Sequence, residues 1–122
     1  MLLNYLPTFS GSQGVIMTAL DENMVMLREW IEDGLDPSQP TVIDFIHSFH
    51  NADDADGFAQ AAISIGYEAI AYEPVDEEGI WEVVASCIIT PTCDAVTAVE
   101  EDLEALALDF DGDSEGWHLP EV

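Results

Sequence analysis

Three histidines and two cysteines are the residues whose types could support nucleophilic or metal chemistry. His47 and His50 lie three positions apart in a predicted strand, a spacing that directs their side chains to opposite faces. Cys87 lies in an apolar run and is expected to be a small buried hydrophobic residue. Cys93 follows Pro91 at a predicted helix start, but its acidic surroundings disfavour a thiolate. These residues predict neither a catalytic pair nor a disulfide framework.

Acidic residues alternate with other types near the C-terminus, at Asp109, Asp111, Asp113 and Glu115. A calcium loop of the EF-hand type needs D-x-D-x-D-G and a glutamate at position twelve, and Gly112 is out of place for it. A weak divalent site and a solvated acidic face are the two interpretations, and we expect no bound metal. Motifs for phosphate loops, dinucleotides and nucleophile elbows are also missing. We therefore predict no catalytic residues, no cofactor and no enzymatic activity.

The charge of the chain is its strongest signal. There are 26 acidic residues and one basic residue, Arg28, which give a formal net charge of -25. This field repels nucleic acids and anionic membranes and attracts basic protein surfaces. Direct nucleic-acid binding is disfavoured because it depends on Lys and Arg that neutralise phosphates. An acidic binding face and an adaptation to a saline environment both account for such a charge, and we favour the first.

A chain of 122 residues with 48 % hydrophobic residues predicts one folded domain and not a disordered acidic tail. The first residues show no basic region and no long apolar stretch, so we expect neither a signal peptide nor a membrane span. The expected location is the cytoplasm. Residues 1–17 are predicted to be an N-terminal lead-in with the Ser and Gly content of a flexible segment, and 18–122 a single α+β domain.

Hydrophobic periodicity places three helices and several strands along this domain. In the first helix, Leu20, Met24, Leu27 and Ile31 form the predicted apolar stripe. The order after this helix is β-α-β-β-α-β, the ferredoxin-like split pattern of an antiparallel sheet with two helices on one face. The helices are expected at 18–33, 53–65 and 93–107, and the strands at 41–49, 67–73, 80–90 and 108–111, with a further candidate at 116–119.

Several segments resemble those of the RraB-type inhibitors of ribonuclease E. WIEDGLDP at 30–37 resembles the LxEDGSDP signature that ends the first helix of that family. FIHSFHNADDADGF at 45–58 continues as the family does, with histidines near a strand end and then an acidic helix start. IGYEA at 65–69 resembles the family's LGYEV. The segment 83–107 matches a cysteine-containing strand and its helix, and LDFDGDSEGWHLPE at 108–121 is similar to the family's VEYDGWGTYFE ending.

The resemblance covers roughly residues 24–119 and implies a ferredoxin-like fold and an inhibitory protein–protein interaction. Members of this family are similar in binding a degradosome endonuclease and altering its activity, as adaptors and not as enzymes. This chain departs from the family by inserting Gly112, Asp113 and Ser114 and by lacking lysine. These departures bear on the identity of the partner more than on the fold.

Three acidic clusters are the predicted binding surface for a basic partner, such as the Arg-rich RNA-binding segment of a ribonuclease. An acidic face would occupy basic residues that otherwise hold RNA, and its binding would weaken with salt. Alternative interpretations are an acidic nucleic-acid mimic or an immunity protein that blocks a DNA-binding or nuclease protein. The clusters are Asp53, Asp54 and Asp56; Glu73, Asp76, Glu77 and Glu78; and Glu100, Glu101 and Glu104.

Overall fold

The computed structural model describes residues 18–120, so the predicted lead-in at 1–17 lies outside the described residues. Within that range the chain forms three helices and one four-stranded antiparallel sheet. The predicted α+β class and the antiparallel sheet are confirmed. The elements are α1 (Ala19–Glu32), β1 (Thr41–Phe49), α2 (Ala52–Ser64), β2 (Glu68–Tyr72), β3 (Trp81–Ile89), α3 (Cys93–Leu108) and β4 (Asp113–His118).

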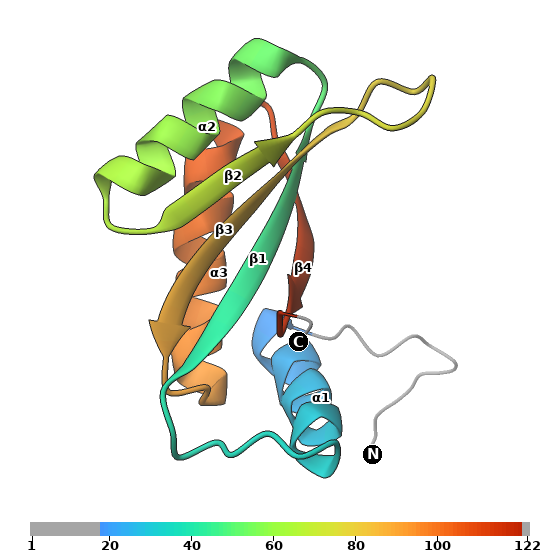
Figure 1. The fold of residues 1–122 in the computed structure, drawn as a ribbon. Coiled ribbons are helices and arrows are strands. Elements are labelled where there is room, and N and C mark those ends of the chain that lie inside the picture. Colours follow the sequence, from blue (N-terminus) through green and yellow to red (C-terminus); the bar gives the residue numbers. More distant parts are fainter. Residues whose placement is uncertain (1–17, 121–122) are drawn as a thin grey trace, which may run out of the picture.

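The strands lie in the order β2-β3-β1-β4, which places the long strands β1 and β3 at the centre. β1 pairs with β3 along its whole length, whereas its pairing with β4 shifts register between Ile46 and His47. Figure 1 shows α2 and α3 on the same side of the sheet and α1 at its lower end, near α3. One face of the sheet is thus covered by helices, and no element within residues 18–120 covers the other.

Each helix begins at a side chain that caps its free backbone amides. Thr18 Oγ1 accepts from the Asp21 amide at 3.1 Å, Asn51 Oδ1 from Asp54 at 2.8 Å, and Thr92 Oγ1 from Ala95 at 3.1 Å. No basic residue occupies the last turn of any of these three helices. None of the helices within 18–120 has the length and apolar character needed to cross a bilayer.

The helix-facing side of β1 forms the middle of the core. Ile43, Phe45, His47 and Phe49 are each at most 1 % exposed. The alternation of residues 41–49 predicts this core side for all of them except His47. Phe58 of α2 packs on this row, with its ring 5.0 Å from that of Phe49. The predicted core side of β1 is therefore confirmed, and the exception made for His47 is wrong.

The predicted apolar stripe of α1 is wrong. Leu20, Met24 and Ile31 are 41 %, 48 % and 42 % exposed, and only Leu27 of that stripe is buried. The helix packs mainly on α3, meets the sheet at Trp117 of β4, and turns a different face inward. That face begins at Asn23, which is 2 % exposed.

The predicted strand at 108–111 is also wrong. α3 continues to Leu108, and a turn over 109–112 follows in which the amides of Phe110 and Gly112 both donate to the Ala107 carbonyl at 2.9 Å. Asp111 adopts a positive φ of 56°, and Gly112 lies against the Phe49 ring with no space for a side chain. The last strand, β4, starts only at Asp113.

A buried amide joins α1 to the C-terminal half of the chain. Asn23 Nδ2 donates to Thr97 Oγ1 at 2.8 Å and to Glu100 Oε1 at 3.0 Å, and Trp117 Nε1 donates to Asn23 Oδ1 at 2.7 Å. The indole N–H can only donate, which fixes the orientation of the amide. We call Asn23, Thr97, Glu100 and Trp117 the Asn23 network. It positions α1 together with Leu27, the one residue of the predicted stripe that belongs to the hydrophobic core.

Asn23→Ala should lower the free energy of unfolding by about 2–4 kcal/mol, because the buried indole N–H and the Thr97 hydroxyl lose their partners. Urea denaturation measures the change, and Gln60→Ala, which removes an exposed amide from α2, is the matched control. A loss no larger than that of the control would contradict a structural role for the network.

Candidate partner-binding surfaces

The candidate nucleophiles lie in settings that oppose reactivity. Burial raises the pKa of the Cys87 thiol, the reverse of what a reactive thiolate requires. The Cys93 Sγ donates to the Leu20 carbonyl at 3.2 Å and so fastens α3 to α1. Both cysteines are free thiols. Residues 18–120 contain no group of three or more His, Cys, Asp or Glu side chains that could hold a metal ion.

His47 is a core residue and not a ligand. Its ring lies 4.9 Å from that of Phe58, and neither ring nitrogen has a hydrogen-bond partner. Burial lowers its pKa to about 4. The polar backbone of Phe45 and the charge of Glu115 act in the opposite direction and raise it. The imidazole is therefore neutral in the folded protein at neutral pH. His50, three residues later, is exposed.

The predicted acidic cluster on α3 is divided by the packing of α1. Glu100 is half-buried and belongs to the Asn23 network, whereas Glu101 and Glu104 are exposed. Burial raises the pKa of Glu100, the hydrogen bond from Asn23 lowers it, and the charges of Glu104, Glu22 and Glu101 raise it. This carboxylate therefore shares its surroundings with like charges.

An open hollow of about 570 Å³ lies between α1, α3 and β4. Its walls carry four carboxylates, and Trp117 and Met26 contribute apolar surface. Such a combination suits a long cationic side chain, whose stem can pack on the apolar atoms while its charge meets the acids. We call Glu22, Glu100, Glu104 and Glu115 with Met26 and Trp117 the acidic hollow.

Two carboxylates of the acidic hollow, Glu22 and Glu115, were missed by sequence reasoning. Glu22 lies in the first turn of α1, and Glu115 lies in β4, where it accepts a hydrogen bond from Ser48 Oγ at 2.8 Å. The docking of α1 on α3 brings Glu22 close to Glu104, and the packing of α3 on β4 brings Glu115 there. The acidic run near the C-terminus was a visible signal for Glu115, but the sequence contained none for Glu22.

The other two predicted clusters lie on separate elements. Asp53, Asp54 and Asp56 occupy the start of α2, where Asp54 Oδ2 also accepts from Asn51 Nδ2 at 3.0 Å. The second cluster surrounds the β2–β3 hairpin, in which Asp76 accepts from the Glu78 amide at 3.0 Å. Both groups are largely exposed, and their use as one surface with α3 stays a prediction.

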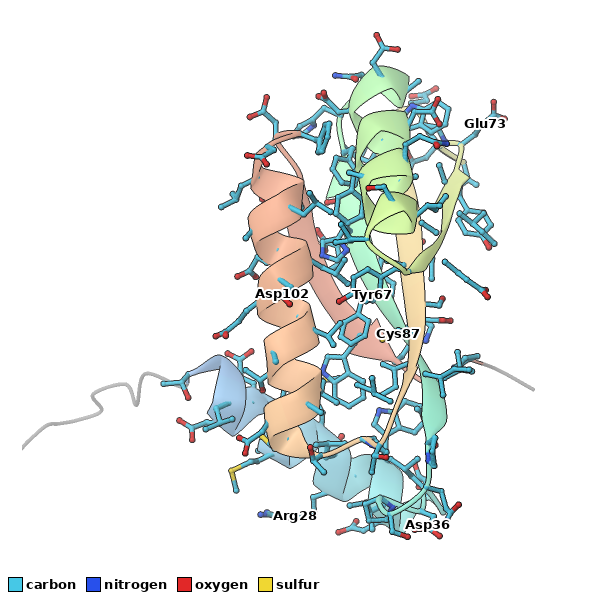
Figure 2. All side chains as sticks on the ribbon, turned by 90° about the vertical axis from the view of Figure 1, so that its left-hand side faces the viewer. Arg28, Asp36, Tyr67, Glu73, Cys87 and Asp102 are labelled. Atoms are coloured by element: carbon cyan, nitrogen blue, oxygen red, sulfur yellow. The ribbon has the colours of Figure 1, made fainter. Side chains whose placement is uncertain are left out.

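Figure 2 views the molecule from the side, with α3 on the left and β3 on the right, and labels Asp102 on α3 and Glu73 near the β2–β3 hairpin. Tyr67 and Cys87 lie between α3 and the sheet in this view. Burial raises the pKa of Tyr67, and the charges of Cys87 and Asp102 add to the effect. The phenol therefore stays protonated, and this part of the helical side serves packing.

Together these observations define a small acidic α+β protein with exposed carboxylate clusters around a single sheet. The chain belongs to the RraB family, which is described as Regulator of ribonuclease activity B. The model of that family matches residues 20–118. It is similar to the Regulator of ribonuclease activity B of Escherichia coli strain K12, at 30 % identity over 102 residues, which cover 80 % of this chain and 72 % of the relative. The Shigella flexneri protein of that name matches with the same identity and coverage. The family resemblance seen in the sequence is thus confirmed.

Replacing His47 by Leu should make unfolding less sensitive to acid. The lowered pKa means that the unfolded chain binds the proton more tightly, so stability is lost as pH falls from about 6.5 to about 4. The free energy of unfolding of His47→Leu relative to wild type should therefore rise by about 3 kcal/mol between pH 7 and pH 4. Urea titrations across this pH range measure it.

The exposed His50→Leu is the matched control and should leave the pH profile unchanged. Equal profiles for the wild type and His47→Leu would show that His47 is not buried as a neutral imidazole. The comparison between variants is needed because protonation of the many carboxylates shifts stability over the same range.

Proposed function

We propose that this protein is a non-catalytic regulator that binds and modulates a ribonuclease E-like endonuclease through its carboxylates. The single observation that carries this proposal is a net charge of -25 on a member of a family of ribonuclease regulators. A ribonuclease must present Lys and Arg to hold RNA, and those residues complement this charge. The family name describes regulation, and membership therefore supports a role outside catalysis.

The proposed mechanism is competition for basic residues of the partner. Carboxylates at the α2 start, the hairpin and α3 would occupy the cations that otherwise contact RNA phosphates, and long-range attraction would speed association. The acidic hollow is the best candidate position for a cationic side chain of the partner, because four carboxylates and an indole surround a space of suitable size. Binding of this kind takes place where RNA is processed, which supports the cytoplasm as its location.

We also assign the sheet to the ferredoxin-like class. The strand order β2-β3-β1-β4, with α2 and α3 as the two crossover helices, supports that assignment. In this arrangement α1 is an addition that is held outside the sheet by the Asn23 network. The acidic hollow is formed between this added helix and the rest of the domain.

Removing two carboxylates of the acidic hollow, together with the exposed Glu101 beside it on α3, should slow binding to the endonuclease. Glu22→Gln/Glu101→Gln/Glu104→Gln is expected to reduce the association rate about tenfold at low salt and to flatten its dependence on salt. Glu100 is left intact because it accepts a hydrogen bond from Asn23. Surface plasmon resonance with the purified ribonuclease over a salt series provides both quantities.

The matched control is Glu29→Gln/Glu32→Gln/Asp33→Asn, which removes the same charge from exposed positions at the other end of α1. Equal losses in the two variants would mean that only the total charge matters. Binding by the wild type that is the same at low and high salt would exclude the competition mechanism.

A further inference from the structure

The helix-free face of the sheet carries rows of side chains that cross the strands in register. One row is apolar: Ile70 of β2 pairs with Val84 of β3, and Val84 pairs with Ile46 of β1. Its neighbour is polar, from Glu68 through Ser86 to Asp44. Since alternate residues of a strand share a face, these rows lie opposite the buried core. This face is a second surface, separate from the acidic hollow.

Four apolar side chains of this face are unusually accessible. Ile88 is 68 % exposed, Ile70 58 %, Tyr72 49 % and Val42 40 %. Large apolar side chains that gather on one exposed face indicate an interaction site more often than scattered ones do. We call these four side chains, together with the half-buried Val84, the open-face strip, so that it consists of Val42, Ile70, Tyr72, Val84 and Ile88. Ile46, at the β1 end of the same row, is only 9 % exposed and is left out.

Carboxylates frame the open-face strip. Glu68 stands at its β2 edge, Glu82 pairs with Tyr72, and Asp44 accepts a hydrogen bond from Ser86 Oγ at 2.6 Å. The only arginine of the chain, Arg28, lies on α1, at the bottom of Figure 2. An occupant of this face therefore meets apolar atoms surrounded by negative charge.

One end of the strip opens into a hollow of about 310 Å³. Val42 and Ile88 give it aliphatic walls, and Glu68 places a carboxylate on its lining. An arginine or lysine matches this shape, because its stem is aliphatic and its tip is cationic. This hollow therefore combines apolar and acidic groups, as the whole face does, in a space that fits one side chain.

We propose that the open-face strip docks an amphipathic segment of a protein partner, in which aliphatic or aromatic residues alternate with arginine or lysine. The proposal rests on the function proposed above, because the segment belongs to the same basic partner. Charge selects this occupant: a second copy would bring another net charge of -25, and RNA would bring phosphates. The acidic residues would guide the segment, and the strip would hold it.

The test compares two double variants that make the same chemical change at different places. Ile70→Thr/Ile88→Thr removes apolar surface from the strip, and Ile31→Thr/Ile63→Thr removes it from exposed positions on α1 and α2. Affinity for the purified ribonuclease E-like endonuclease should fall about tenfold or more in the first variant and stay within about twofold in the second. Circular dichroism melts check that both variants remain folded.

A synthetic peptide of about 12 residues with alternating Arg and Leu provides a probe that does not depend on the endonuclease. It should bind the wild type and Ile31→Thr/Ile63→Thr equally, bind Ile70→Thr/Ile88→Thr about tenfold more weakly, and lose affinity when Ser replaces Leu. Equal binding of the Leu and Ser peptides, or of the peptide to both variants, would overturn the proposal.

The two proposals fail in different ways. If the endonuclease never binds the wild type, the proposed function is wrong, while the peptide still tests the face. If the endonuclease binds both double variants like the wild type, the function stands and the use of this face is overturned. Self-association or single-stranded RNA binding that Ile70→Thr/Ile88→Thr abolishes would also overturn the proposed occupant.

Discussion

The side-chain amide of Asn23 connects three elements that are far apart in the sequence. It accepts from Trp117, a residue 94 positions later, and donates to Thr97 and Glu100 of α3. A buried amide of this kind is costly unless all its partners are in place, so it permits one rotation of α1 and disfavours others. The position of the acidic hollow depends on that rotation, since Glu22 and Met26 come from α1. Local helix propensity sets the length of α1, and the Asn23 network sets which of its side chains face the acidic hollow.

Much of the fold could be predicted because its signals are local. The alternation along 41–49 predicts the buried row that includes Phe45 and Phe49. The near-continuous hydrophobicity of 80–90 is typical of a central strand, and β3 is one. Thr18 with Asp21 and Asn51 with Asp54 marked two helix starts through capping. The orientation of α1 was not predictable in this way, because its decisive contact is made to a residue near the other end of the chain.

The candidate site was predictable only in part, for the same reason. Glu104 could be selected as an exposed acid from the sequence, but its proximity to Glu22 and Glu115 arises from tertiary packing. The exposed, helix-free face of the sheet was not predictable from the sequence for a different reason. A strand that is apolar on both faces is expected to be covered on both, yet Ile88 and Ile70 lie in the open. The predicted strand at 108–111 failed because a helix end with alternating acids has a strand-like pattern.

The absence of basic residues from the last turns of α1, α2 and α3 has a consequence beyond local helix stability. The carbonyl end of a helix carries partial negative charge, and here no arginine or lysine side chain complements it. Counterions from the solvent, such as sodium or potassium, therefore balance the negative charge in a diffuse layer around the surface. A basic partner of the proposed kind would release those ions when it binds, so that part of the driving force would be the entropy of the released ions. The affinity of the proposed complex would then depend on the concentration of salt around it.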